Sequence, residues 1–243
     1  MTKNLVKVMS FDGIPYRYRP GTTDEKVARE VITNRCYRRA SAGFDVEPGE
    51  HWLDLGANVG AFAVYCKIRG ATAECYEPDA DCFDLLVRNA VGFRCVRAAV
   101  TGRTSTTVGM WTSAVPGNHY RGTVLGSLGR SVDDPIEVPN VFAGDLVGWY
   151  DGVKMDIEGG EFDLIDRWLI PPCHKLCLEY HTSRDQSMTN LGRRLDVLRS
   201  KFVTVSYVPE LDRLLAAGGM RKSFHDRVIY CTYEKPRGVV PAG

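Results

Sequence analysis

The chain has 243 residues, of which 44% are hydrophobic and 25% are charged, a composition typical of a globular protein with one sizeable core. Lys and Arg number 31 against 30 Asp and Glu, so the near-neutral charge disfavours a nucleic-acid partner, which requires a cationic surface. No apolar run approaches the roughly 20 residues that span a bilayer and no secretory signal is visible, so we expect a cytoplasmic protein without a membrane span.

The N-terminal part of the chain predicts a β-hairpin followed by a helix. The run "NLVKVMSFDGIPYRYRP" alternates in hydropathy on both sides of Asp12-Gly13, which is typical of a hairpin with a glycine turn. Next, "TTDEKVAREVITNRCYRR" places hydroxyls and acids ahead of an apolar stripe with the helical period. We therefore predict an N-terminal cap over residues 1–45 and a second domain over residues 46–243.

From residue 51 onward, strands and helices are predicted to alternate. Strands are expected at "HWLDLG", "TAECYEP" and "FRCVRAAV", with helices at "VGAFAVYCKIR" and "DCFDLLVRNAV" between them. Residues 101–134 are rich in Gly, Ser and Thr and predict one or two irregular strands with a long loop. The alternation resumes with a strand at "GVKMDI", a helix at "EFDLIDRWL" before Pro171-Pro172, a strand at "KLCLEYH", a helix at "LGRRLDVLRSKF", and β runs at "VTVSYV" and "RVIYCTYE". This order predicts an α/β protein whose mainly parallel sheet is covered by helices on both faces.

The eight cysteines are expected to be reduced. Most of them lie inside apolar patterns such as "AECYEP" and "KLCLEY", where a thiol behaves as a small hydrophobic side chain.

The segment "LDLGANVGAF" joins the first of these strands to its helix and predicts a cofactor loop. Gly56 and Gly60 let the backbone approach a ligand closely, and amides at the start of a helix favour a bound anion or carboxylate. Glu77 ends the next strand, 21 residues after Gly56, where an acid can accept hydrogen bonds from both hydroxyls of a ribose. A nucleoside-bearing cofactor is the functional interpretation, and a tight turn beside a solvated glutamate is the structural one.

The choice between cofactors depends on Asn58 and Asp54. Asn58 stands where a dinucleotide motif requires a glycine to admit the pyrophosphate, which disfavours NAD. Asp54, inside the first strand, can hold amide donors of the turn or the amino group of a bound amino acid. An adenosine joined to an amino acid fits these residues better than a dinucleotide, and S-adenosylmethionine has that structure.

At this point the sequence resembles the class I S-adenosylmethionine-dependent methyltransferases, and more narrowly the FkbM-type family. The resemblance rests on "WLDLGANVGAFAVYC", "YEPD", "RNAVGFRCVRAAV" and "VKMDIEGGEFDLI", and it covers roughly residues 46–181 well. The phrase D-I-E-G-x-E after a basic residue is its most specific part, with Gly160 where alanine is commoner. It implies a Rossmann-like fold with a seven-stranded sheet of order 3-2-1-4-5-7-6 and an antiparallel last strand. It also implies methyl transfer to oxygen, most often to a hydroxyl of a sugar or of a secondary metabolite.

The resemblance further implies a cofactor site. Its residues form the glycine-rich loop, the ribose-binding acid with its neighbours beside the adenosine, and the end of the third strand, where the adenine edge is read. They are Asp54, Gly56, Asn58 and Gly60, then Glu77, Pro78, Asp79 and Phe83, and finally Arg97 and Ala98.

Acids and a histidine follow two neighbouring strands and predict the seat of proton removal. Asp156 and Glu158 end one strand, while Glu179 and His181 end the next, and carboxyl ends of parallel strands face one crevice. We expect His181, Asp156 or Glu158 to take the acceptor proton, directly or through Mg²⁺ or Mn²⁺ with Asp156 as a ligand. His181 as a mere strand cap is the alternative, and Glu161 is expected to complement the dipole of the helix it begins.

The acceptor is expected to be a glycan or a small molecule. The segments 111–130 and 210–226 carry aromatic, histidine and arginine side chains that suit a sugar, although His119 and His225 resemble ordinary surface histidines. The alternatives are a polyketide-like hydroxyl and, from another class, a nucleotide-binding oxidoreductase. A nucleic-acid methyltransferase is disfavoured by the charge and by the absence of a motif for base amines, and a non-catalytic module by the presence of Glu77 and the acid cluster.

Overall fold

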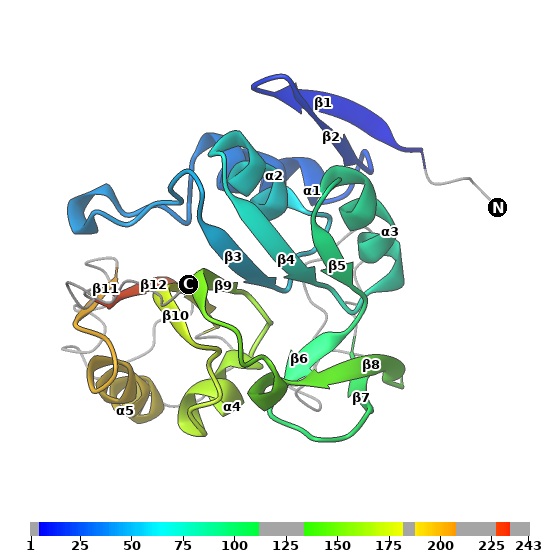
Figure 1. Cartoon of the computed structure of the whole chain (residues 1–243). Coiled ribbons are helices and arrows are strands. Elements are labelled where there is room, and N and C mark those ends of the chain that lie inside the picture. Colours follow the sequence, from blue (N-terminus) through cyan, green and yellow to red (C-terminus); the bar gives the residue numbers. More distant parts are fainter. Residues whose placement is uncertain (1–4, 112–133, 182–187, 208–226, 234–243) are drawn as a thin grey trace, which may run out of the picture.

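The computed structural model describes residues 5–111, 134–181, 188–207 and 227–233. Its largest element is a seven-stranded sheet with the strand order β11-β12-β10-β9-β3-β4-β5 (Figure 1). In chain order these strands are β3 (His51–Leu55), β4 (Thr72–Tyr76), β5 (Arg94–Val96), β9 (Tyr150–Met155), β10 (Cys173–Tyr180), β11 (Thr204–Tyr207) and β12 (Arg227–Thr232).

The pairing of these strands confirms the predicted α/β fold. Strands β3, β4, β5, β9 and β10 pair in parallel, whereas β12 runs antiparallel to both of its neighbours. Numbered by their order in the chain, the seven strands read 3-2-1-4-5-7-6 across the sheet. The carboxyl ends of β3, β4, β9 and β10 therefore lie along one edge, which is where ligands bind in open α/β sheets.

Helices cover both faces of the sheet, and the side-chain alternation along β3 shows how. Trp52 packs with α2 (Ala61–Ile68) and α3 (Ala80–Asn89), whereas Leu53 and Leu55 pack on the other face with α4 (Glu161–Asp166) and α5 (Met188–Arg199). Successive residues of a strand point to opposite faces, so an all-apolar strand is buried on both sides. Burial of such side chains from water is the main stabilising contribution to the fold.

The N-terminal hairpin and helix pack against the first of these faces. Strands β1 (Lys7–Phe11) and β2 (Ile14–Tyr18) form the predicted hairpin, with Asp12 and Gly13 at positive φ in its turn. The predicted helix is shorter than expected. It consists of α1 (Asp24–Ala28) and a π-helical turn (Arg29–Thr33), and it ends before Arg35, which adopts positive φ. The domain boundary at residues 45 and 46 remains a prediction.

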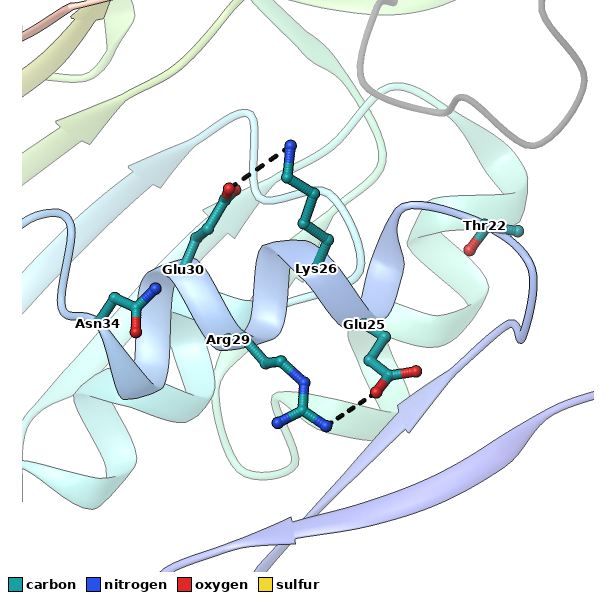
Figure 2. Close-up of a pocket in the computed structure, with 6 residues that line it drawn as sticks. All are labelled: Thr22, Glu25, Lys26, Arg29, Glu30 and Asn34. Atoms are coloured by element: carbon teal, nitrogen blue, oxygen red, sulfur yellow. Dashed lines mark hydrogen bonds and ion pairs between the residues drawn. The ribbon is translucent and has the colours of Figure 1, made fainter.

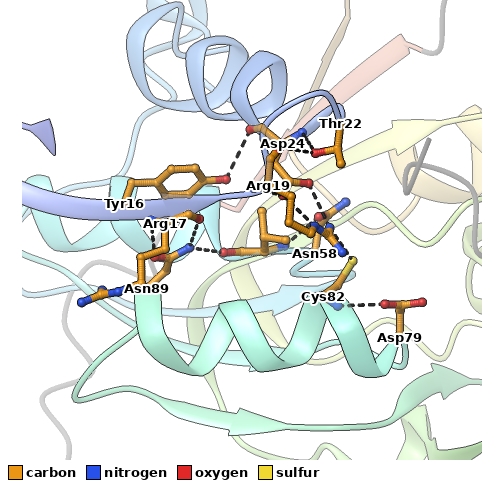
Figure 3. A network of polar contacts seen from close by, with 10 residues as sticks. Tyr16, Arg17, Arg19, Thr22, Asp24, Asn58, Asp79, Cys82 and Asn89 are labelled. Atoms are coloured by element: carbon orange, nitrogen blue, oxygen red, sulfur yellow. Dashed lines mark hydrogen bonds and ion pairs between the residues drawn. The ribbon is translucent and has the colours of Figure 1, made fainter. Parts of the chain in front are cut away.

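A polar network joins this N-terminal segment to α3 and the glycine-rich loop (Figure 3). The guanidinium of Arg19 forms a buried ion pair with Asp24 at 2.9 Å and also donates to Cys82 Sγ in α3. Asn89 Nδ2 donates to the carbonyls of Arg17 and Val59, and its Oδ1 accepts from the Arg17 amide. The hairpin is thus hydrogen-bonded, through one side chain, to the loop that precedes α2.

The region after β5 differs from the prediction. The expected third strand over residues 93–100 is two strands, because the Ala98 amide donates to the Val96 carbonyl at 3.1 Å and this tight turn redirects the chain. The second piece, β6 (Ala99–Thr101), pairs with β8 (Ile136–Phe142), which also pairs with β7 (Thr107–Met110) in a separate sheet. Strand β8 was not predicted, since Pro139 interrupts its pattern.

Three further features can be compared with the prediction: the cysteines, the end of helix α4 and the character of the helices. All eight cysteines are free thiols, and six of them are buried as small core side chains. Helix α4 ends at Asp166, earlier than the predicted stop at the proline pair, and Trp168 follows at positive φ. In the described part of the chain, none of the helices combines the length and the apolar character that a membrane span requires.

A shallow hollow lies on the outer side of α1 and the π-helical turn (Figure 2). Two exposed ion pairs, Lys26 with Glu30 and Arg29 with Glu25, follow the helical i, i+4 spacing there. Such pairs contribute little to stability, and none of the predicted site residues lines the hollow.

Candidate active site

The two glycines of the loop after β3 serve the packing of the loop. Gly56 has φ +77°, and a Cβ there would lie 1.8 Å from the carbonyl oxygen of Asp156. Gly60 has φ +91°, and a Cβ there would lie 3.0 Å from Leu86 Cδ1 of α3. A side chain at Gly56 would therefore separate the loop from the end of β9. The absence of a side chain at Gly56 thus lets the loop approach the backbone of Asp156, directly after β9.

The amides of the loop are already paired inside the protein. The amides of Gly56 and Ala57 both donate to the Tyr76 carbonyl, at 3.0 and 2.9 Å. Asn58, which has φ +50°, donates its amide to Glu77 Oε2 at 2.7 Å, and its own Oδ1 accepts from the Val59 amide. The loop thus fixes its own conformation and ties itself to the end of β4.

Glu77 is a buried carboxylate that holds two backbone amides. Its oxygens accept from Asn58 and from Asp79, at 2.7 and 2.9 Å, and only 7% of the residue is exposed. Burial raises the pKa of Glu77 to about 7, although these hydrogen bonds oppose the shift. An ionised carboxylate has about four lone-pair positions, so two amide donors leave room for further donors.

The remaining predicted cofactor residues lie around the ends of β4 and β5. Asp79 caps α3 by accepting from the Cys82 amide at 2.8 Å, and it is partly exposed, as are Pro78 and Phe83. Arg97 is exposed, whereas Ala98 is buried in the core. The structure thus gathers these residues at one edge of the sheet, and their contacts with a cofactor remain predictions.

Asp54 and Lys154 form a buried pair across the two central strands. They are register partners in β3 and β9, and Lys154 Nζ lies 3.1 Å from Asp54 Oδ1. The contact is an ion pair with poor hydrogen-bond geometry, because neither Asp54 oxygen has a hydrogen-bond partner in the described structure. Burial raises the pKa of Asp54 above its usual value, although Lys154 opposes this. Lys154 instead donates to the Gly56 carbonyl at 2.7 Å.

Asp156 follows β9 and contacts a residue that the sequence did not suggest. The Tyr37 hydroxyl, from the N-terminal segment, donates to Asp156 Oδ2 at 3.3 Å, and Lys154 Nζ lies 3.9 Å from the same oxygen. Tyr37 is buried, and burial together with Asp156 raises the pKa of its phenol well above the usual value. Its segment is attached to β12, since the Tyr230 hydroxyl donates to the Cys36 carbonyl at 2.5 Å.

Glu158 and His181 complete a cluster with Asp156. His181 Nε2 lies 3.6 Å from Asp156 Oδ1 and 3.5 Å from Glu158 Oε2, and one ligand atom from each residue falls within 4.8 Å of the others. The structure therefore brings the three predicted catalytic residues together. Strand alternation does not produce this arrangement, because β9 ends at Met155 and Glu158 adopts φ +53° in the following turn.

Glu161 holds the histidine of this cluster. As expected it is the first residue of α4, but it is fully buried. Its Oε1 accepts from both the backbone amide and Nδ1 of His181, at 3.0 and 2.9 Å, and its Oε2 accepts from the Gly159 amide. Burial alone would lower the pKa of His181, but the carboxylates of Glu161, Glu158 and Asp156 hold it well above its usual value.

Comparisons with known proteins agree with the resemblance found in the sequence. No protein-family model matches the chain. Over 68 residues it is 38% identical to the 31-O-demethyl-FK506 methyltransferase FkbM of Streptomyces tacrolimicus, a match that covers 27% of this chain and 25% of that protein. The chain is therefore similar to an FkbM methyltransferase. The similarity spans about a quarter of the curated relative.

Solved structures resemble the fold at low identity. Magnesium protoporphyrin IX methyltransferase from Synechocystis PCC 6803 has 10% identity and a TM-score of 0.45, over 87% of this chain and 83% of that chain. Fibrillarin from Aeropyrum pernix has 12% identity and a TM-score of 0.45, over 93% and 82% of the respective chains. A 16S rRNA methyltransferase from T. thermophilus has 15% identity and a TM-score of 0.45, over 98% and 47%. Similarities of this size concern the fold alone.

Proposed function

We propose that this chain is an S-adenosylmethionine-dependent methyltransferase that acts on a hydroxyl oxygen. The observation that carries the proposal is the placement of two buried carboxylates, Asp54 and Glu77, on either side of the glycine-rich loop, beside the Asp156 cluster. The similarity to an FkbM methyltransferase supports it.

The buried carboxylates fit the charged and polar ends of this cofactor. Asp54 is fully buried beside Lys154, and because neither of its oxygens accepts a hydrogen bond in the described structure, both can accept from the ammonium group of the methionine part. Glu77 retains lone pairs that suit the two ribose hydroxyls. The loop between them is fixed by its own hydrogen bonds, so this arrangement exists before a ligand arrives.

The protein's part in methyl transfer is alignment and proton removal. When bound, the cofactor supplies a methyl group made electrophilic by a positive sulfur. Alignment of the acceptor oxygen with that carbon lowers the barrier by several kcal/mol. The cluster of Asp156, Glu158 and His181 then takes the hydroxyl proton, and positioned proton acceptors contribute about 100- to 10,000-fold.

A sugar or glycan hydroxyl is the acceptor that we propose, on the basis of the family resemblance. A hydroxyl of a small metabolite is the second candidate, because the FkbM relative is named for the acceptor 31-O-demethyl-FK506. The segments 111–130 and 210–226, which we expect to shape the acceptor site, lie outside the described residues except for Trp111, and His119 and His225 lie outside them as well.

Cofactor binding and methyl transfer test the proposal together. We expect S-adenosylhomocysteine, and not NADH, to bind in calorimetry, and labelled S-adenosylmethionine to methylate a member of an acceptor panel. The panel holds sugars, glycans, polyketide diols and RNA. Binding of NADH alone would overturn the proposal, and transfer to RNA alone would overturn the sugar and small-molecule acceptors.

The substitution Asp156→Asn tests the proposed cluster. The fold should persist, because the backbone at position 156 can keep its contacts around Gly56, whereas the rate should fall at least about 100-fold as the proton acceptor weakens. Asp151→Asn, at the opposite end of the same strand, is the matched control and should keep the wild-type rate. Near-wild-type turnover of Asp156→Asn would remove Asp156 from the chemistry.

A further inference from the structure

We propose that Asp156, Glu158 and His181 form a binding site for one divalent metal ion with two carboxylate ligands and one imidazole ligand. The ligand atoms come from the ends of the neighbouring strands β9 and β10 and lie within 4.8 Å of one another. His181 Nε2 is 3.6 and 3.5 Å from the two carboxylates. Atoms separated by this distance can share an ion that lies about 2.0–2.2 Å from each of them.

The environment of His181 is the second observation that points to a metal. Histidines that bind metals usually donate their other ring N–H to a carboxylate, which fixes the tautomer and the orientation of the ring. Glu161, fully buried, accepts from His181 Nδ1 at 2.9 Å and from the His181 backbone amide. Because this contact keeps a proton on Nδ1, loss of the Nε2 proton to a binding metal directs the Nε2 lone pair toward Asp156 and Glu158.

Asp156 is also oriented by a side chain outside the proposed ligand set, the hydroxyl of Tyr37. Its Oδ2 accepts from the Tyr37 hydroxyl at 3.3 Å and lies 3.9 Å from Lys154 Nζ, whereas its Oδ1 faces His181. Tyr37 and Lys154 are both buried, so this orientation is fixed by packing. One oxygen is thus oriented by the protein while the other points into the cluster, which is the arrangement found around ligating carboxylates.

The backbone of Glu158 is a third observation. Glu158 adopts φ +53°, a conformation that costs a residue with a Cβ about 1–3 kcal/mol and that concentrates at functional sites. Gly159, which follows it directly, also has a positive φ, of +102°, but has no Cβ that would be strained there. In this turn the strain therefore falls on the residue whose carboxylate faces His181 at 3.5 Å.

The donor set indicates the class of metal. Two carboxylates and one imidazole suit Mn²⁺ and related transition ions, whereas Mg²⁺ and Ca²⁺ prefer oxygen donors alone. Three protein ligands leave coordination positions open for an acceptor hydroxyl, whose proton a bound cation makes easier to remove. This last role rests on the proposed methyl transfer, whereas the metal site itself does not.

Metal binding can be measured on the full chain without any acceptor. After treatment with EDTA and dialysis, we expect calorimetry with MnCl₂ to give one site per chain that binds more tightly than MgCl₂. Electron spin-echo spectroscopy of the Mn²⁺ complex should detect a histidine nitrogen, and His181→Gln should abolish that coupling. Asp156→Asn with Glu158→Gln should remove the site, and Asp151→Asn should leave it unchanged.

Substitutions of Tyr37 and Glu161, which contact the proposed ligands, should weaken metal binding without abolishing it. We expect Tyr37→Phe and Glu161→Gln to weaken Mn²⁺ binding about 10- to 100-fold while the nitrogen coupling persists. Because Glu161 is buried, Tyr37→Phe carries the test if the Glu161 variant does not fold. No saturable Mn²⁺ binding, or binding unchanged in the Asp156 and Glu158 double variant, would overturn the proposal. Full methyl transfer in EDTA overturns only the role of the ion in proton removal, and Mn²⁺ binding without methyl transfer to any acceptor overturns only the proposed function.

Discussion

The raised pKa of Glu77 predicts that the proposed binding of a ribose by this residue depends on pH. The folded protein gives this carboxyl a pKa of about 7 instead of 4.5, mainly because it is buried. The ionised form accepts from two ribose hydroxyls, whereas protonation removes one acceptor position and adds a donor. Lowering the pH through 7 should therefore weaken the binding of a ribose-bearing ligand.

The size of the effect follows from the fraction of ionised Glu77. With a pKa of about 7, roughly one tenth of the carboxyl is ionised at pH 6 and roughly nine tenths at pH 8. If only the ionised form binds, the apparent Kd equals the intrinsic Kd divided by the ionised fraction. The apparent Kd should therefore be about tenfold higher at pH 6 than at pH 8. The same shift acts on stability with the opposite sign: this group opposes folding above pH 7, and that penalty disappears as pH falls toward 4.5.

Calorimetry with 5′-methylthioadenosine isolates this contact. The ligand carries the ribose but lacks the titrating amino-acid groups of S-adenosylhomocysteine. Glu77→Gln is the matched variant, because Gln cannot ionise yet keeps the size of the side chain and one acceptor oxygen. Its affinity should be weaker at pH 8 and should not change between pH 6 and 8. A wild-type Kd that is equal at both pH values, or a Gln variant with the wild-type slope, would refute the reasoning.

Two further predictions concern stability, measured as the free energy of unfolding in urea. Gly92 and Gly56 both have positive φ, but of the two only Gly56 has a neighbour, the Asp156 carbonyl oxygen, that an added methyl group would strike. Gly92→Ala should therefore cost about 1–2 kcal/mol, and Gly56→Ala about 3 kcal/mol more than that. Equal losses would contradict the contact with Asp156. Lys154→Met should cost about 3–5 kcal/mol, because it leaves Asp54 buried and unpaired, and adding Asp54→Asn should restore much of the loss. Additive losses in the double variant would argue against this pairing.

The sequence predicts the sheet well because its central strands are short, mainly apolar runs that alternate with helical patterns. The positions of Glu77, Asp156 and His181 follow from the same patterns, since each directly follows a strand and parallel strands end at one edge. Strand β8 escaped prediction because Pro139 breaks its pattern. The division between β5 and β6 depends on one backbone hydrogen bond, from Ala98 to Val96, that leaves no pattern in the sequence.

The contacts of two members of the site, Tyr37 and Glu161, could not be found in the same way. Tyr37 reaches Asp156 across 119 residues of sequence, and only the packing of the N-terminal segment brings them together. Lys154, by contrast, did leave a signal, because a lysine next to the buried residues Val153 and Met155 of a strand is almost never buried unless it is paired. Glu161 was expected to act on the helix dipole alone, and its contact with His181 arises from a turn whose geometry the sequence does not specify.

The attachment of the N-terminal segment to β12 has a consequence for synthesis. Cys36 and its hydrogen-bond partner Tyr230 are separated by 194 residues, and a ribosome that adds about 5–20 residues per second takes roughly 10–40 s to cover that distance. During this time the segment around Cys36 lacks its contact with β12. Tyr37, which is buried in the finished protein, then lacks part of the structure that holds its segment in place. The edge of the sheet that carries Asp156 is thus completed only after β12 has been made, by a segment that precedes β12 by almost two hundred residues.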